Sequence, residues 1–462
     1  MNSKEEAAFS GDANMQAYLG VCYELGNEGY PQDYQKARMW YERAALQGLA
    51  GAQYLLGSLY YFGKGVPQDF RDARAWFERA AAQGNDDAQT YLGMMYAQGQ
   101  EVPQDFRKAR KWFEKAAFQG NARAQFHLGE LYYFGQGVPQ DYHTTRIWLE
   151  RAAARGSLEA LACLGHLYNF GHGVPQDFQK ARSCYEQAAA LGDPLSQYNL
   201  GVLYRDAQGG PQDYQKAREC FERAAEQGYA KAQFNLGVFY HSGQGVPQDY
   251  RKAFEYYMKA ARQGHAESQT RIGMLYGNGS GVPKDYRKAR EWFEKAAAQG
   301  NANAQTFLGD IYYYSLDVPK DCQKAKQWYE AGARQGNERS QAMLGMLYMD
   351  GEGVPQDYQK ARKWLEKAAA AGHVHAQLWL GELYYYGRGV PQDYQKTLEW
   401  LEKAAESGNA EAQSNLGVMY RDGQGVQRDL ETALHWFTRS CINGNQDACE
   451  ECVELRRTLG KQ

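Results

Sequence analysis

The chain has 462 residues, of which 44% are hydrophobic, and its formal net charge is −3. So small a net charge gives no electrostatic signal for nucleic acid or for an anionic membrane surface. No apolar run approaches the roughly 20 residues that a membrane-spanning helix needs, and the N-terminus has no secretory signal pattern. The sequence does not determine the cellular compartment: it is cytoplasmic on the sequence as given, and periplasmic or secreted if a signal peptide has been removed.

The first twelve residues are predicted to be the tail of a repeat. Residues 4–11 read KEEAAFSG, which resembles EKAAFQG at residues 114–120. We therefore expect residues 1–12 to form a partial N-terminal repeat, the end of a second helix.

A single period runs through the rest of the chain. Eleven prolines follow one another at intervals of 36 residues: Pro31, Pro67, Pro103, Pro139, Pro175, Pro211, Pro247, Pro283, Pro319, Pro355 and Pro391. A glycine after Leu or Ile recurs in the same way, from Gly20, Gly57 and Gly93 to Gly417. A period of this size is typical of a repeat array. One architecture of twelve full repeats therefore covers residues 13–444, in place of the roughly three domains that length alone suggests.

Each repeat is predicted to be a helix-turn-helix unit. In the first helix, near residues 86–98, apolar side chains recur at helical spacing: Ala88, Leu92, Met95 and Tyr96. The second helix begins near Asp69, which is a good N-cap residue, and ends at Gly84, which accepts a left-handed conformation without strain. Gly63, Gly65 and Pro67 form the turn between the helices.

Three positions of the repeat indicate a continuous core. The glycine inside the first helix costs about 1 kcal/mol relative to Ala, so we expect the helices to approach closely there. A Tyr follows that glycine by three residues in all twelve repeats, and nine repeats carry Trp nine residues after the proline position, from Trp40 to Trp436. We interpret these rings as stacking residues, and expect the loss of one Trp to cost roughly 3–5 kcal/mol locally.

The C-terminal segment is predicted to close the array. Residues 445–462 have Val453 and Arg456 where a repeat would have Gly and Tyr. A helix with no following neighbour can present a polar face, so we expect a capping helix there. The fold class predicted from these patterns is all-α.

The repeat consensus AQxxLGxxYxxGxGVPQDYxKAxxWxEKAAxQG resembles the Sel-one-like repeat family, which is related to the tetratricopeptide repeats. The resemblance covers essentially the whole chain. It implies a right-handed α/α superhelical solenoid of twelve 36-residue repeats. It also implies a non-enzymatic scaffold or adaptor that binds a protein or an extended peptide along its concave groove. The balanced charge and the lack of a long apolar run predict no nucleic-acid binding and no membrane insertion, and a monomer is favoured.

The sequence predicts no catalytic, cofactor or metal site. Serine-nucleophile, phosphate-loop, dinucleotide and zinc-protease motifs are missing, and His373 and His375 are interpreted as ordinary exposed histidines. Cys184 and Cys220 stand where other repeats have Trp, and we expect them to be buried and reduced. Three further cysteines that replace helical residues are interpreted in the same way: Cys22, Cys163 and Cys322.

Two alternative functions remain at this stage. The spacing of Cys441 and Cys449 resembles a cysteine-rich, secreted branch of the same family, in which such pairs bridge neighbouring helices and some members are described as binding or slowly hydrolysing penicillins. That resemblance implies a disulfide between the two residues and a β-lactamase-like or penicillin-binding alternative, although the spacing occurs once here. The second alternative is an immunity-type or effector-type inhibitor of a toxin or host protein.

The candidate partner-binding residues are the variable positions of the first helix. By analogy with tetratricopeptide arrays, positions three before the glycine and one, four and five after it face the groove. They are Tyr54, Tyr61, Phe62, Phe126, Glu130, Tyr133, Phe134, His166, Tyr198, Phe234, Asp310, Tyr313, Tyr314, Leu378, Glu382, Tyr385 and Tyr386. Aromatic platforms with carboxylates suit a peptide with apolar and basic side chains. The alternative is that the paired aromatic residues only support the turn.

Overall fold

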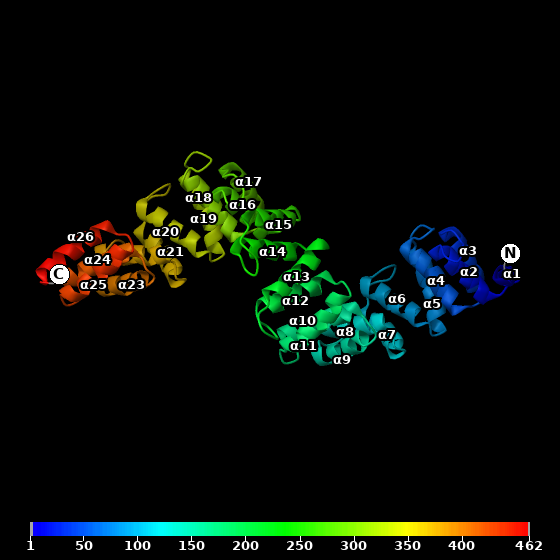
Figure 1. Ribbon diagram of the computed structural model, residues 1–462. Coiled ribbons are helices and arrows are strands. Elements are labelled where there is room, and N and C mark those ends of the chain that lie inside the picture. The colour runs from blue at the N-terminus through cyan, green and yellow to red at the C-terminus, as the bar shows by residue number, and fades with distance from the viewer. Residues whose placement is uncertain (1–2, 461–462) are drawn as a thin grey trace. The chain divides into compact units, whose positions relative to one another are not determined.

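The computed structural model describes residues 3–460, and over this range the chain is α-helical, with no strand. It forms two compact units that meet in sequence at Tyr229 and Ala230. Helices α1–α13 belong to the first unit and α14–α26 to the second (Figure 1).

The helices of the first unit are α1 (Ser3–Phe9), α2 (Ala13–Leu25), α3 (Tyr34–Leu46), α4 (Ala50–Phe62), α5 (Phe70–Ala82), α6 (Asp86–Gln98), α7 (Phe106–Phe118), α8 (Ala122–Phe134), α9 (Tyr142–Ala153), α10 (Leu158–Phe170), α11 (Phe178–Ala190), α12 (Pro194–Arg205) and α13 (Tyr214–Glu226). Those of the second unit are α14 (Ala230–Ser242), α15 (Tyr250–Arg262), α16 (Ala266–Asn278), α17 (Tyr286–Ala298), α18 (Ala302–Tyr313), α19 (Cys322–Arg334), α20 (Glu338–Asp350), α21 (Tyr358–Ala370), α22 (Val374–Tyr386), α23 (Tyr394–Glu406), α24 (Ala410–Asp422), α25 (Leu430–Ile442) and α26 (Gln446–Thr458).

Each repeat is one helix pair. The first helix of a repeat, such as α4, packs against the second helix of the same repeat, α5, and within each unit that second helix packs against the first helix of the next repeat. This succession confirms the predicted all-α solenoid of helix pairs.

In nine of the twelve repeats a Pro-Gln-Asp segment leads from the first helix to the second. In the second repeat, the Gln68 side chain donates to the Tyr61 carbonyl at 2.9 Å, and the Asp69 amide donates to the Tyr60 carbonyl at 3.0 Å. The Asp69 carboxylate then accepts from the amide of Asp72 at 3.0 Å, as predicted for an N-cap. The turn thus satisfies carbonyls at the end of one helix and amides at the start of the next.

The glycine inside the first helix makes room for a ring on the second helix. A Cβ placed on Gly57 would lie 2.8 Å from Phe77 Cδ1, and one on Gly417 would lie 2.8 Å from Phe437 Cδ1. Both rings are fully buried. The predicted close approach is therefore between the glycine and a side chain, and the ring follows the Trp position by one residue.

The tryptophans occupy the surface between consecutive repeats, where they are mostly half-buried. Trp112 packs against a core that its own repeat and the preceding one share, with Leu92 from its own repeat and Phe77 from the preceding one. The Lys115 ammonium group lies 4.3 Å from the centre of the Trp112 ring on its other side. The tryptophans thus connect repeats as predicted, whereas the residue that follows, a ring in nine repeats and a leucine in three, is more deeply buried.

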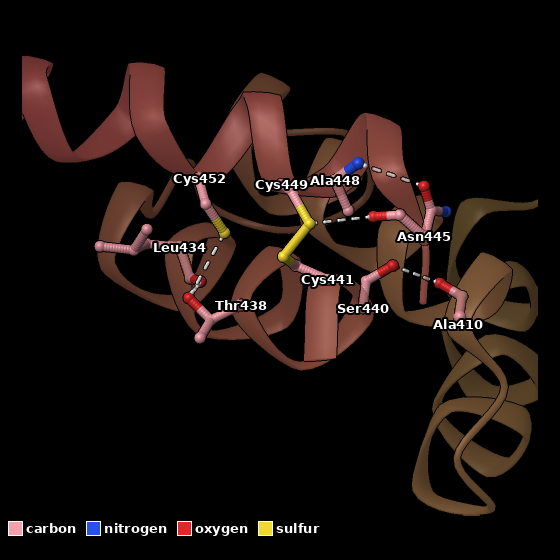
Figure 2. Close-up of a disulfide and its surroundings, with 9 residues drawn as sticks. All are labelled: Ala410, Leu434, Thr438, Ser440, Cys441, Asn445, Ala448, Cys449 and Cys452. Carbon is pink, nitrogen blue, oxygen red and sulfur yellow. Dashed lines mark hydrogen bonds between the residues drawn. A yellow bond between two sulfur atoms is a disulfide. The ribbon is translucent and has the colours of Figure 1, made fainter. Parts of the chain in front are cut away.

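The C-terminal helix α26 is attached covalently to α25. Cys441 and Cys449 form a disulfide with an S–S distance of 1.95 Å (Figure 2). Cys452, on the same helix as Cys449, lies in the core, with its sulfur 3.4 Å from the Thr438 hydroxyl. Val453 is exposed.

The fifth and sixth repeats have less aromatic packing than the others. Cys184 and Cys220 replace Trp there, and neither forms a disulfide. Burial raises the pKa of both thiols to about 11, so both are neutral near pH 7. Tyr256, the third residue that replaces a Trp, compensates for the exchange: its ring stacks on Tyr240 with the centroids 5.7 Å apart.

Hydrogen exchange should report this difference. Because each repeat is held by its neighbours, fewer buried ring atoms make local opening cheaper. We expect amides within 184–220 to exchange faster than those within 292–364, as measured by mass spectrometry on the intact chain. Equal protection of the two segments would contradict the expectation.

Two glycines of α4 offer a matched test of the glycine–ring contact. Gly57→Ala places a methyl group against Phe77, and overpacking of this kind costs typically about 1–3 kcal/mol. A Cβ at Gly51, on the same helix, meets nothing within 4 Å, so Gly51→Ala should stabilise the helix by up to about 1 kcal/mol. Thermal unfolding should therefore shift down for Gly57→Ala and slightly up for Gly51→Ala; shifts of the same sign would refute the steric explanation.

Candidate functional site

The first-helix face is the surface formed by the side chains one, four and five residues after each repeat glycine. Four repeats place two aromatic rings at the last two of these positions, in edge-to-face contact with centroids 4.8–5.0 Å apart. The second ring of each pair projects outward with 51–61% of its surface exposed: Phe62, Phe134, Tyr314 and Tyr386. Large exposed rings at one repeated position form a plausible contact surface.

The first ring of each pair supports the turn. Tyr133 and Tyr385 contact the first residue of the next helix, with ring centroids 5.4 Å from Tyr142 and 5.5 Å from Tyr394. Tyr61 is buried against Phe70 in the same way. Tyr313 is half-buried, with the Lys320 ammonium group 4.7 Å from its ring centre. The first ring of each pair therefore supports the turn, and contact with a partner stays a prediction for the exposed second ring.

Three predicted contact residues, Tyr61, Leu378 and Asp310, lie in the core, which corrects the expectation that they face an open groove. Leu378 is only 1% exposed and packs with Leu398 and Leu401. Asp310 is 5% exposed: its carboxylate accepts from the Tyr329 hydroxyl at 2.8 Å and from the Arg339 guanidinium at 2.7 Å. Burial raises the pKa of Asp310, and Arg339 opposes that change.

The remaining residues three before the glycine are half-buried against the ring of their own repeat. The centroid distances are 6.1 Å for Tyr54 and Phe77, 5.8 Å for Tyr198 and Phe221, and 5.7 Å for Phe234 and Tyr257. Phe126 lies instead beside His127, at 5.3 Å. These side chains therefore lie beside the first-helix face, with one part of each exposed and another part packed against the core.

Two cavities open on this face at the same position of different repeats. The Glu382 pocket, about 250 Å³, is formed by α22, α23 and α24, and the Glu130 pocket, about 150 Å³, is formed by α8, α9 and α10. In both, the buried ring of the repeat is replaced by a leucine, Leu401 or Leu149, whose Cδ2 would lie 3.1 Å from a Cβ on the glycine. Leucine alone does not open a cavity, because Leu365 at the same position packs more closely, at 2.5 Å from a Cβ on Gly345. At Leu149 and Leu401 space remains beside the glycine, and the next residue, a glutamate, lines it.

The Glu382 pocket is polar and acidic. Glu382 and Glu411 bring carboxylates from α22 and α24, and Tyr385, Tyr386 and Asn415 complete the wall. Burial, and then the nearby Glu411, raise the pKa of Glu382 to about 7; Asp350 acts in the same direction and Arg388 against it. This pocket therefore holds a carboxyl group that a bound cation would ionise.

The Glu130 pocket is more apolar. His127 Nδ1 lies 2.7 Å from the Glu130 carboxylate and pairs with it. Burial raises the pKa of Cys163 to about 12, and burial together with His172 lowers the pKa of His166, so both of these lining groups are neutral near pH 7. Phe134 forms the exposed rim.

Three residues that shape these pockets were not among the predicted site residues: Leu149, Leu401 and Glu411. The two leucines are visible in the sequence as departures from the aromatic residue that most repeats have at that position. His375 is exposed, as predicted, whereas His373 is half-buried. His373 caps α22, because its Nδ1 accepts from the Ala376 amide at 3.2 Å.

The repeats match a known family. A family model described as Sel1 repeat matches residues 13–49, 50–85, 86–121, 122–157, 158–193, 194–229, 230–265, 266–301, 302–337, 339–373, 374–409 and 410–445. No curated protein matches the chain. Within residues 3–460, no helix combines the length and the apolar character needed to cross a membrane.

Solved structures with the same architecture include two from bacteria. A protective antigen of uropathogenic Escherichia coli with an SLR fold is 35% identical, with a TM-score of 0.84 over 99% of this chain and 97% of its own. A Sel1 repeat protein from Oxalobacter formigenes is 35% identical, with a TM-score of 0.51 over 67% of this chain and 89% of its own. An immunity protein from Pseudomonas aeruginosa is 19% identical, with a TM-score of 0.32 over 46% of this chain and 82% of its own, too little to carry a functional argument.

The raised pKa of Glu382 makes stability depend on pH. The native state keeps a proton that the unfolded chain loses near the ordinary value of 4.5, so the free energy of unfolding falls as pH rises from there to about 7. Glu382→Gln removes this loss. We expect the variant to melt above wild type at about pH 8 and to match it at about pH 4. A difference between wild type and Glu382→Gln that does not vary with pH would contradict the expectation.

Proposed function

Because the chain belongs to the Sel1 repeat family, we propose that it is a non-enzymatic protein-interaction scaffold that binds an extended polypeptide on its first-helix face. Repeat solenoids of this type commonly serve protein–protein interaction. The proposal assigns the Glu130 and Glu382 pockets as the sites that receive side chains of the bound polypeptide. The recurrence of a cavity, a glutamate and an exposed ring at one repeat position carries the argument.

The Glu382 pocket suits a lysine or arginine side chain. Two carboxylates meet in it, and a cation between them would relieve the repulsion that raises the pKa of Glu382. The exposed Tyr386 ring at its rim already accepts a cation, since the guanidinium of Arg388 lies 4.7 Å from its centre. The Glu130 pocket suits an apolar side chain, because its carboxylate is paired with His127 and the rest of its wall is neutral.

The penicillin-related alternative gains no support from these cavities. The disulfide that suggested it joins the last two helices, and neither of its cysteines lines either pocket.

A displayed library of random peptides, selected on the immobilised full chain, tests the proposal. We expect enriched peptides to contain Lys or Arg near an apolar residue. Glu382→Lys should abolish their binding, because a reversed charge repels a basic side chain and lowers its on-rate. Glu406→Lys makes the same charge change on the exposed side of α23 and should have no effect. Peptides that bind wild type and Glu382→Lys equally would place recognition elsewhere.

The exposed rings allow a second comparison with the enriched peptides. Tyr386→Ala should weaken binding by at least about 1–2 kcal/mol if this ring is a hot spot. Phe118, at the end of α7, is also exposed but lies on a second helix, so Phe118→Ala should leave binding unchanged. Isothermal titration of the two variants against one peptide measures the difference; equal losses would show that the first-helix face has no special role.

A further inference from the structure

A third cavity, of about 330 Å³, lies between second helices α11 and α13 and first helix α12 of the first unit. It is formed by other repeat positions than those of the first-helix face, and its assignment does not rest on the function proposed above. Ala189 and Leu200 form its apolar floor, Tyr204 forms a wall, and Cys220 and Arg223 line it from α13.

The other repeats show what normally fills this space. Cys220 stands at the tryptophan position, and two repeats earlier Trp148 packs with Ala117, Leu128 and Tyr132, which are the equivalents of Ala189, Leu200 and Tyr204. Trp112 packs in the same way on Ala81 and Leu92. The same floor and wall thus hold an indole elsewhere in this chain.

The exchange of Trp for Cys leaves the apolar floor less well covered than in other repeats. Leu200 keeps 6% of its surface exposed, whereas Leu92 and Leu128 keep 0%. The neighbouring helices do not close the gap, since the cavity is more than twice the roughly 150 Å³ that suffices for benzene in an engineered apolar site.

The cation that covers the indole in other repeats is retained. Lys or Arg three residues after the tryptophan lies 4.1–5.1 Å from the ring centre at Trp40, Trp76, Trp112, Trp148, Trp292, Trp364, Trp400 and Trp436. Arg223 holds this position after Cys220 and lines the cavity. The fifth repeat, which has Cys184, carries Gln187 there instead. The sixth repeat therefore keeps both the apolar floor and the cation, without the ring.

The polar wall of the cavity is already satisfied. Arg182 donates to the Tyr204 hydroxyl at 3.0 Å, and that hydroxyl donates to the Glu186 carboxylate at 3.2 Å. The Arg182 guanidinium also lies 4.3 Å from the centre of the Tyr204 ring. Groups paired in this way offer an occupant a preformed surface and call for no charged partner inside the cavity.

We propose that the cavity at Cys220 is a receptor site for a tryptophan side chain presented by a partner polypeptide. The indole would lie on Ala189 and Leu200 beneath the Arg223 guanidinium, as the chain's own tryptophans lie in other repeats. Lys216 and Glu219 at the cavity provide a donor and an acceptor for the peptide groups that flank the indole.

Methyl NMR of the full chain, with N-acetyl-tryptophanamide as the probe, tests the proposal on the unaltered protein. The Ala189, Ala190 and Leu200 methyl signals should shift saturably as the probe is added. Ala117 and Leu128 serve as internal controls, because Trp148 fills their equivalent space. The proposal would be overturned if the signals of the Cys220 cavity did not shift at any probe concentration up to its solubility limit. It would also be overturned if the control signals shifted equally.

Two variants and a second probe sharpen the result. Cys220→Trp fills the cavity and should weaken probe binding at least tenfold, whereas Cys220→Ala keeps the cavity open and should retain binding. N-acetyl-leucinamide should bind at least tenfold more weakly than the tryptophan derivative; equal affinity would show that the site is merely apolar and would overturn its assignment to an aromatic side chain. If Cys220→Trp fails to fold, the methyl shifts and the probe comparison still decide.

Discussion

The contact between a glycine of the first helix and a ring of the second is the constraint on which the repeat depends. Without a Cβ at Gly57 or Gly417, the ring of Phe77 or Phe437 lies flat against the first helix and is removed from water. That contact sets how closely the two helices approach. The capped Pro-Gln-Asp turn then fixes their register, and the tryptophans join one pair to the next.

A fold built on one repeated ring can acquire a cavity by the loss of ring atoms at a single position. Where the buried ring becomes Leu149 or Leu401, space opens on the first-helix face beside the glycine. Where tryptophan becomes Cys220, space opens between the second helices. The helices themselves stay in place, because each is still held by its neighbours and by its caps. Departures from the consensus, more than the consensus, therefore give this scaffold its individual sites.

The sequence was sufficient for the architecture, and less so for the candidate site. Periodicity, the Asp N-caps and the glycines after the helices placed every repeat, because these signals are local. Exposure at the variable positions depends on what the neighbouring helix supplies. Leu378 is buried by α23, and Asp310 is buried because Tyr329 and Arg339 bind its carboxylate; neither relation follows from spacing along the chain. The tryptophan and the ring after it are adjacent in sequence. Only the structure shows that the tryptophan packs between repeats while the next ring packs on the glycine within one repeat.

The contrast between Asp310 and Glu382 shows how one repeat position changes its role. Both follow the glycine directly. Asp310 faces a tyrosine hydroxyl and a guanidinium, which satisfy its charge within the fold. Opposite Glu382 stands Leu401, which has no hydroxyl, and the second carboxylate nearby, Glu411, adds repulsion. A half-buried carboxyl without a matching donor is costly to ionise, so its pKa is raised, and a bound cation would lower it. The residue across the helix pair thus decides whether a carboxylate at this position finds its partner within the fold.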